Sequence, residues 1–407
     1  MTRLRLVRLL LVRPLLVASL LAILAGCAPT RTAVDSTLPG VGTLPPPASA
    51  WPSAQYDARH SSGTTATGPQ RGDIRWQATL GGAIVPGPVI GIHGDILAAS
   101  NDGVLTDLDP HDGSVLWRFD GGNGYGSDLS TSPAVLTDGR ILWPGPGDTL
   151  FVLTAGGAEL ERIAFDGTVL SPAVAGHGRV YVADASGGLA ALDASGSRIS
   201  RVWRMRLGTS SYASPTVGPD GSIYAADDRH LYAVRDLGSH GAVRWSFETK
   251  KPIEVSSAVS PDGTVILGTN HDKEYGIDRD GTVKWAIDIG DYTYSSSTAT
   301  AAGLAYFADN TGRVRTVTSS SGAVLHVQRP LGPTGKEHAW TSIAVDAAGD
   351  TYWGTEKGNV YGYDAAGTRL FGVDVGSGVT SYPALGADGT LYFGTHDGRL
   401  IALGGGG

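Results

Sequence analysis

The chain has 407 residues, of which 41% are hydrophobic and 17% charged, so it is long enough to bury a large apolar core. Residues 1–27 hold four Arg and no acidic residue, and the rest of the chain has 27 basic and 39 acidic residues, a net charge of −12. The sequence has no cluster of basic residues that could bind along a phosphate backbone, so we do not expect nucleic acid as a partner. Cys27 is the single cysteine, which excludes an intrachain disulfide and a thiolate metal cluster.

The first 27 residues have the composition of an export signal. A basic stretch is followed by an apolar run from Leu15 to Leu24, which is short for a bilayer span. The run ends in Leu24-Ala25-Gly26-Cys27, which resembles the lipobox of bacterial lipoproteins. That resemblance implies cleavage before Cys27 and acylation of its thiol, which would hold the protein at a membrane by its lipid anchor. The alternative is a plain signal peptide with an incidental Cys.

The next segment, residues 28–50, is rich in Pro, Thr and Ala and has no periodic apolar face. We expect a disordered or polyproline-type tether that spans at most roughly 75 Å when fully extended. Residues 51–407 then form the folded domain, which we expect to be monomeric and displayed outside the cytoplasm, on the outer face of the cytoplasmic membrane or on an outer membrane.

That domain is an array of repeats of about 40 residues. A Pro or Ser begins a short apolar strand in each unit, and these positions are 45, 39, 43, 42, 40, 45 and 41 residues apart. They are Pro88, Pro133, Pro172, Pro215, Ser257, Ser297, Ser342 and Pro383. Each unit contains runs of four to seven residues with partial alternation, separated by Gly-containing turns, and the dipeptide Asp-Gly occurs ten times. The pattern predicts an all-β fold, an eight-bladed β-propeller of four-stranded antiparallel blades.

The repeat is out of phase with the chain ends. The eighth unit stops at Ile401-Ala402-Leu403 without a fourth strand, and an unpartnered strand around Trp76 precedes the first unit. We expect this N-terminal strand, within residues 70–80, to complete the last blade and close the ring. A Trp recurs on the fourth strand and should pack one blade against the next. These positions are Trp117, Trp203, Trp245 and Trp285, with Leu160, Leu325 and Leu370 in the weaker copies.

The unit, best seen in "SPAVLTDGRILW" and "GLAALDASG", resembles the pyrroloquinoline-quinone (PQQ) repeat over most of residues 70–403. With the lipobox and the tether, the chain is similar to the outer-membrane assembly lipoproteins of the BamB family. That resemblance implies a non-enzymatic binding or scaffold module with protein or small-molecule partners at the cell envelope. Quinoproteins that use PQQ carry a Ca²⁺ site and usually a vicinal disulfide, which one Cys cannot form. We therefore expect no cofactor, with PQQ and calcium as the alternative.

The loops before the first strand and between the second and third strands of each unit should share one face around the axis. They carry aromatic and charged side chains that suit a ligand in the funnel mouth. The candidates are Tyr125, Asp128, Tyr212, Glu254, His271, Tyr292, Tyr294, Lys336, His338, Trp340, Tyr382 and His396. The alternative for each is an ordinary polar loop residue.

No residue is assigned to catalysis or to a metal. His271, Asp272 and Glu274 lack tight ligand spacing, so a solvated loop explains them better. No G-x-S-x-G elbow accompanies the many Ser residues. The alternative to a binding module is an enzyme, either a quinoprotein-type oxidoreductase or a carbohydrate-active propeller that uses the same face.

Overall fold

The computed structural model describes residues 49–124, 131–270, 273–290, 292–329 and 337–404. Cys27, the signal segment and residues 28–48 of the expected tether lie outside these ranges. In the described ranges, no helix is long and apolar enough to cross a lipid bilayer.

The described strands form eight four-stranded antiparallel sheets, each a blade numbered in chain order. Blades 1 and 2 contain β2 (Val89–Ile90), β3 (Ile96–Ser100), β4 (Val104–Leu108), β5 (Val115–Asp120), β6 (Ala134–Val135), β7 (Ile141–Gly145), β8 (Thr149–Leu153) and β9 (Glu159–Ala164). Blades 3 and 4 contain β10 (Ala173–Val174), β11 (Arg179–Asp184), β12 (Gly188–Asp193), β13 (Ser200–Arg206), β14 (Thr216–Val217), β15 (Ile223–Ala226), β16 (His230–Asp236) and β17 (Gly241–Glu248). Blades 5 and 6 contain β18 (Ala258–Val259), β19 (Val265–Gly268), β20 (Lys273–Ile277), β21 (Val283–Asp288), β22 (Thr298–Ala299), β23 (Leu304–Ala308), β24 (Val314–Thr318) and β25 (Val324–Gln328). Blades 7 and 8 contain β26 (Ala344–Val345), β27 (Thr351–Gly354), β28 (Asn359–Tyr363), β29 (Arg369–Asp374), β30 (Ala384–Leu385), β31 (Leu391–Gly394), β32 (Arg399–Leu403) and β1 (Ile74–Thr79).

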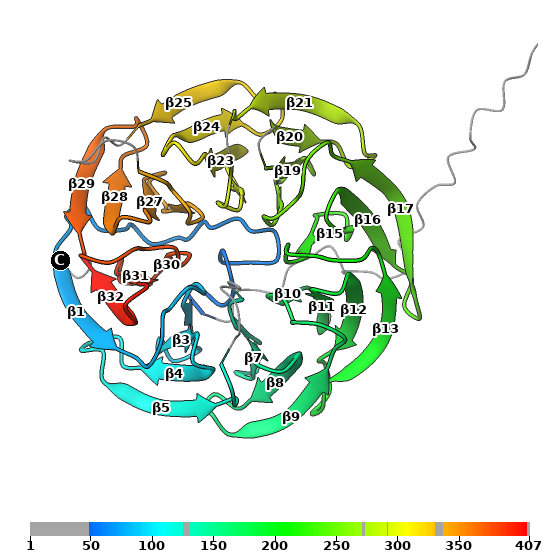
Figure 1. Cartoon of the computed structure of the whole chain (residues 1–407), viewed down its shortest axis with the longest axis horizontal. Helices are drawn as coiled ribbons and strands as arrows, with labels where there is room; N and C mark the ends of the chain where they lie inside the picture. Colours follow the sequence, from blue (N-terminus) through cyan, green and yellow to red (C-terminus); the bar gives the residue numbers. More distant parts are fainter. Residues whose placement is uncertain (1–48, 125–130, 271–272, 291, 330–336, 405–407) are drawn as a thin grey trace, which may run out of the picture. The chain divides into compact units, whose positions relative to one another are not determined.

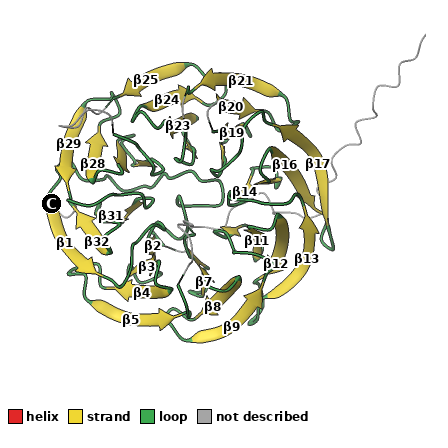
Figure 2. Ribbon diagram, viewed as in Figure 1, coloured by secondary structure: helices red, strands yellow, loops and turns green. Residues whose placement is uncertain are grey.

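The blades stand around a common axis, with the shortest strand innermost and the fourth strand on the rim (Figure 1, Figure 2). β1 pairs antiparallel with β32, which places Trp76 opposite Ala402. The N-terminal strand therefore completes the blade that the C-terminus leaves unfinished, and the predicted fold and closure are confirmed. Closing the ring leaves each sheet covered on both faces by its neighbours, so the middle strands are almost wholly buried.

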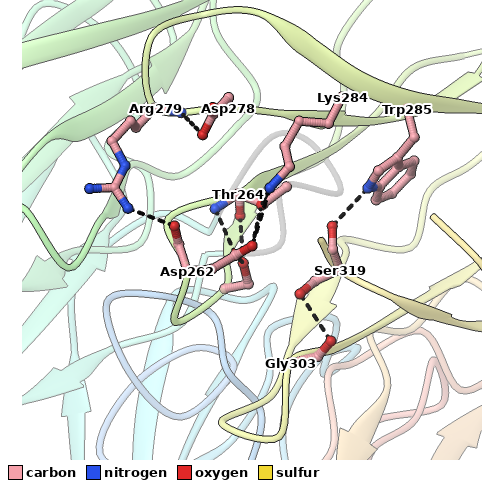
Figure 3. Close-up of polar contacts among 9 residues, drawn as sticks. Asp262, Thr264, Asp278, Arg279, Lys284, Trp285, Gly303 and Ser319 are labelled. Carbon is pink, nitrogen blue, oxygen red and sulfur yellow. Dashed lines mark hydrogen bonds and ion pairs between the residues drawn. The ribbon is translucent and has the colours of Figure 1, made fainter. Parts of the chain in front are cut away.

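The recurring Trp joins neighbouring blades. In blade 5, the Trp285 indole Nε1 donates a 2.7 Å hydrogen bond to the carbonyl of Ser319 in blade 6 (Figure 3). The ring lies over Gly322, where an added Cβ would come within 2.6 Å of the indole. The indole Nε1 of Trp245 donates in the same way to the carbonyl of Arg279 at 2.8 Å, and that of Trp76 to the carbonyl of Pro110 at 2.8 Å. The predicted packing role of the Trp is thus confirmed at these junctions.

In the weaker copies, the Trp position lies one residue later than the sequence predicts. A β-bulge precedes it, and the residues in that register are Glu161, His326 and Phe371, opposite Val152, Thr316 and Gly362. Leu160, Leu325 and Leu370 were expected there and each lies one residue earlier. Leu160 and Leu325 are 49% and 48% exposed, and Leu370 is partly exposed. Successive side chains of a strand point to opposite faces of the sheet, so a shift of one residue moves the Leu from the blade interface to the outside.

In blades 4, 5 and 8, the Asp of the Asp-Gly turn between the first two strands pairs with a cation on the rim strand of the same blade. In blade 5, Asp262 accepts hydrogen bonds from the backbone and hydroxyl of Thr264, and Lys284 Nζ lies 3.2 Å from its carboxylate (Figure 3). Burial raises the pKa of Asp262, but bonds from Ser260, Thr264 and Lys284 outweigh it and lower the pKa to about 2. The carboxylate thus stays ionised and stabilises the turn.

Residues 51–66 cross the centre of the ring, as the blue segment of Figure 1 shows. Their carbonyl groups accept hydrogen bonds from backbone N–H groups of the innermost strands, which would otherwise have an unpaired edge toward the axis. The donor–acceptor pairs are Ile90 to Trp51, Val135 to Pro52, Val217 to Ala58, Val259 to Arg59, Ala299 to His60 and Val345 to Ser62. This segment therefore binds six of the eight blades at the centre.

The backbone of this segment is tightly coiled. Gln55, Tyr56, His60 and Ser62 all have positive φ, a conformation that side chains disfavour. Tertiary bonds hold it in place: Gln55 Nε2 donates to the Ser297 carbonyl at 3.0 Å, and His60 Nδ1 lies 2.8 Å from the Ser257 carbonyl.

Candidate functional site

A cavity of about 720 Å³ lies where the loops that lead into the innermost strands converge. Each of these loops enters the innermost strand of its blade, and the turn to the second strand lies at the other end of that strand. The described entry loops of the blades therefore lie on the same face of the propeller. Six of the candidate side chains line the cavity: Tyr212, Glu254, Tyr294, Trp340, Tyr382 and His396. Its volume is typical of a small-molecule or peptide site.

Two further candidates lie beside these six, and four have no described position. Tyr292 stacks on Tyr294, with ring centroids 5.9 Å apart, and His338 stacks on Trp340 at 6.4 Å. Tyr125, Asp128, His271 and Lys336 lie outside the described residues. The described candidates therefore belong to one region of the molecule, although they come from five different blades.

A series of serine side chains that the sequence analysis did not identify links neighbouring blades, and three of them, Ser214, Ser256 and Ser296, line the cavity. The backbone N–H of Ser171 donates to Ser214 Oγ at 3.2 Å, that of Ser214 to Ser256 Oγ at 2.9 Å, and that of Ser256 to Ser296 Oγ at 3.1 Å. In blade 2, Ser132 begins this series by donating to Ser171 Oγ at 2.9 Å. The signal was present, because a Ser precedes the repeat anchor in most units.

Tyr382 replaces this serine in blade 8 and reaches across to blade 6. Its hydroxyl lies 3.1 Å from Ser296 Oγ. Blade 1 has Gly87 at the same position, and a Cβ there would come within 2.8 Å of the Tyr382 Cβ. The small residue in blade 1 thus makes room for the large one in blade 8, and Tyr382 extends the hydroxyl series beyond Ser296.

The aromatic side chains at the mouth form a continuous row across blades 6 and 7. Tyr294 meets Trp340 edge to face, with centroids 5.2 Å apart, and Tyr292 and His338 extend the row at its two ends. The Trp340 indole Nε1 donates to Asn310 Oδ1 at 2.9 Å, which fixes the ring plane. His338 Nδ1 lies 3.1 Å from Glu356. The row is therefore held in place before any ligand binds.

Two ionisable groups of the described lining are Glu254 and His396. Burial and then the charge of Glu254 raise the pKa of Tyr294, which keeps that hydroxyl protonated. His396 Nε2 lies 2.7 Å from Thr380 Oγ1. A hydroxyl beside an imidazole is part of a nucleophilic site, but such a site also needs a third group that orients the ring. Among the described residues, no carboxylate forms an ion pair with His396, and Glu356 pairs with His338 instead.

PQQ and calcium, the cofactors suggested by the repeat, do not fit these residues. PQQ carries three carboxyl groups and needs cationic partners, yet the described lining holds one carboxylate and neither Lys nor Arg. In the described ranges, no group of three His, Cys, Asp or Glu side chains could hold a metal ion. We therefore derive no reaction step through them.

Comparisons with known proteins agree with the fold. The family model described as outer membrane protein assembly factor BamB, a PQQ-type repeat model, matches residues 101–199 and 200–404. No curated protein matches the sequence.

Among solved structures, BamB from Moraxella catarrhalis is 15% identical, with a TM-score of 0.61 over 81% of this chain and 98% of that one. The quinohemoprotein alcohol dehydrogenase of Comamonas testosteroni is 12% identical, with a TM-score of 0.68 over 88% and 81%. Saccharomyces cerevisiae Sqt1 is 12% identical, with a TM-score of 0.69 over 82% and 98%. Identities this low show the fold alone. The family model covers most of the chain, and the protein belongs to the PQQ-like repeat family of the outer membrane assembly factor BamB.

Proposed function

We propose that this protein is an exported, lipid-anchored propeller that binds a protein partner at the cell envelope and catalyses no reaction itself. Residues 1–27 would be the signal peptide, Cys27 the lipidated residue and residues 28–50 the tether. Membership of the BamB family supports the envelope location and a protein partner. The observation that carries the proposal is the row of preordered aromatic rings at the mouth of the axial cavity.

An aromatic row suits docking because rigid rings offer a large apolar contact area at little entropic cost. The cavity accepts a side chain, while the row packs beside it. The described lining has a His beside a Thr but no group that orients the imidazole, so binding explains this site better than catalysis.

Site-specific photo-crosslinking tests the docking site in the native envelope. A crosslinker at Tyr294 in the full-length protein should yield a defined adduct, and Trp340→Ala should reduce it at least tenfold. A crosslinker at Leu160, on the exposed rim of blade 2, is the matched control and should yield none. Equal adducts from both positions would reject the site, and turnover of a small substrate without any adduct would reject the binding role.

The anchor is tested separately with Cys27→Ser. Full-length protein from cells fed radiolabelled palmitate should carry the label and sediment with membranes, and the variant should do neither. Label retained by the variant would show that Cys27 is not the acylated residue.

An oxidoreductase remains the second candidate function, because the fold is shared with a quinohemoprotein alcohol dehydrogenase. A thermal-shift titration of the full-length protein with PQQ and Ca²⁺ tests it. A ligand that binds only the folded state adds about 2.7 kcal/mol of stability at a hundredfold excess over Kd. We expect no saturable shift, because the described lining lacks cations for the carboxylates.

A further inference from the structure

Glu254 is the acidic residue of the described cavity lining, and its side chain is exposed. Among the described residues, no ion pair or side-chain hydrogen bond involves its carboxylate, and the described lining contains no Lys or Arg. The charge of Glu254 instead contributes to the raised pKa of the Tyr294 hydroxyl. Within the part of the chain that the structure describes, the cavity therefore holds a negative charge without a fixed counter-charge, in a protein whose charge beyond residue 27 is already −12.

The walls around this carboxylate are aromatic. Tyr212, Tyr294, Trp340 and Tyr382 reach the cavity from four different blades. The face of an aromatic ring is electron-rich and attracts a cation, most strongly when the ring is Trp. Tyr294 and Trp340 meet at 63°, so the two rings form a corner and not a flat surface.

Oxygen atoms complete the lining. Ser214, Ser256 and Ser296 contribute hydroxyls, and Tyr382 adds another beside Ser296. Thr131 also lines the cavity; it is only 1% exposed, and its Oγ1 has no hydrogen-bond partner among the described residues. A buried hydroxyl without a partner is costly, and a ligand with N–H groups would satisfy it. Each of these oxygens can accept a hydrogen bond from such a group.

The described lining offers a carboxylate, aromatic rings and acceptor oxygens and contains no fixed cation, and this combination matches one ligand chemistry. We propose that the axial cavity binds an organic cation, an ammonium or guanidinium group, against Glu254 and between Tyr294 and Trp340. This inference rests on the proposed docking function and names its chemistry: the partner would present a Lys or Arg side chain to the funnel. A free amine has the same chemistry, and the test separates the two sources.

Binding to the full-length protein in detergent is measured by calorimetry with matched pairs of probes. Choline is compared with its neutral carbon analogue 3,3-dimethylbutan-1-ol, and N-acetyl-lysine amide with N-acetyl-norleucine amide. We expect the lysine derivative to bind saturably and at least tenfold more tightly than its neutral partner. Stronger binding of choline than of the lysine derivative would point to a free amine. Absence of saturable binding by both cations at millimolar concentrations, or equal binding of the neutral analogues, would overturn the inference.

Glu254→Gln keeps the shape of the side chain and removes its charge. We expect it to weaken cation binding at least tenfold, whereas Glu248→Gln, an exposed carboxylate on the rim strand β17, should change it less than twofold. Both variants should melt at the same temperature as the parent. An unchanged affinity in Glu254→Gln would reject the role of the carboxylate.

The crosslinking assay at Tyr294 separates this inference from the proposed function. Loss of the partner adduct in both Glu254→Gln and Trp340→Ala supports the cation site. Loss in Trp340→Ala alone means that the partner docks through the aromatic row without a cation, which rejects the inference and keeps the docking function. No adduct in the unmodified protein rejects the docking function itself.

Discussion

The indole of Trp285 in blade 5 donates a 2.7 Å hydrogen bond to the carbonyl of Ser319 in blade 6, and both residues are buried. Because the same bond recurs at other junctions, the Trp ring contributes to stability as a repeated link between sheets that share no backbone pairing. Junctions that keep the Trp should therefore resist unfolding more than junctions that have lost it.

Trp285→Phe tests the hydrogen bond at one such junction. The substitution keeps most of the apolar contact but leaves the buried Ser319 carbonyl unpaired, which should lower the free energy of unfolding by about 1–3 kcal/mol. Trp285→Ala adds a cavity and should cost about 3–5 kcal/mol. Urea unfolding of the full-length protein measures both, with the exposed Leu160→Ala expected within about 0.5 kcal/mol of the parent. A Phe variant as stable as the parent would show that the bond contributes nothing.

The junction between blades 6 and 7 offers the opposite test. His326 stands at the Trp position, and a cavity of about 630 Å³ reaches it together with Ala365. A Cβ on Gly367 would lie 3.8 Å from the His326 ring, so this junction is looser than the one under Trp285. His326→Trp should fill part of the space and raise the free energy of unfolding by about 1 kcal/mol.

The control for this gain is Glu161→Trp at the corresponding position of blade 2. Glu161 Oε1 accepts a 2.5 Å hydrogen bond from the backbone of Ile199, so the site is already occupied and the substitution should cost about 1–2 kcal/mol. If both Trp substitutions have the same effect on urea unfolding, room at the junction does not decide their outcome.

The number of blades could be predicted from the sequence because each repeat has side-chain alternation and turn residues. The closing strand could be predicted because the strand around Trp76 precedes the first repeat and the last repeat lacks a fourth strand.

The Trp register in the weak copies is predicted one residue early, because Leu is matched to Trp by its apolar character. The same bulge accompanies Trp117 and Trp285. The spacing of four residues from the turn Gly to the Trp, as from Gly113 to Trp117, also leads from Gly157 to Glu161 and could have marked the position. Residues 51–66 bind the blades through backbone carbonyls, so their side chains show no period. Loop residues could be assigned to one face, but the meeting of Tyr382 with Ser296 depends on the curvature of the whole ring.

His60 makes the free energy of unfolding fall as the pH is lowered. It is buried in the central segment, and this burial, partly opposed by the Ser257 carbonyl, lowers its pKa from 6.5 to about 4. Above pH 6.5 the imidazole is neutral in both states and its contribution is complete. Between pH 6.5 and 4 the unfolded chain takes up a proton that the folded protein does not, so stability falls by up to about 1.4 kcal/mol per pH unit.

His60→Asn should remove this slope from the pH dependence of urea unfolding between pH 4 and 7, although the variant is less stable at pH 7. His93→Asn, an exposed position on blade 1, should keep the slope. An identical slope in the parent and in His60→Asn would place the acid sensitivity elsewhere.

Glu274 affects the pH dependence of stability in the opposite direction from His60. Burial raises its pKa from 4.5 to about 8, although a bond from the Ser297 hydroxyl and the charge of Arg315 lower it. The folded protein therefore keeps a proton that the unfolded chain loses above pH 4.5, so stability falls as the pH rises from 4.5 to 8. Glu274→Gln resembles the protonated acid and cannot ionise. Its stability relative to the parent should increase steadily from pH 5 to pH 8, by up to about 1.4 kcal/mol per pH unit. Glu254→Gln at the solvent-exposed cavity mouth controls for the change in net charge and should show no such trend. A constant difference between Glu274→Gln and the parent would mean that this carboxyl is ionised inside the folded protein at neutral pH, with Arg315 as its counter-charge.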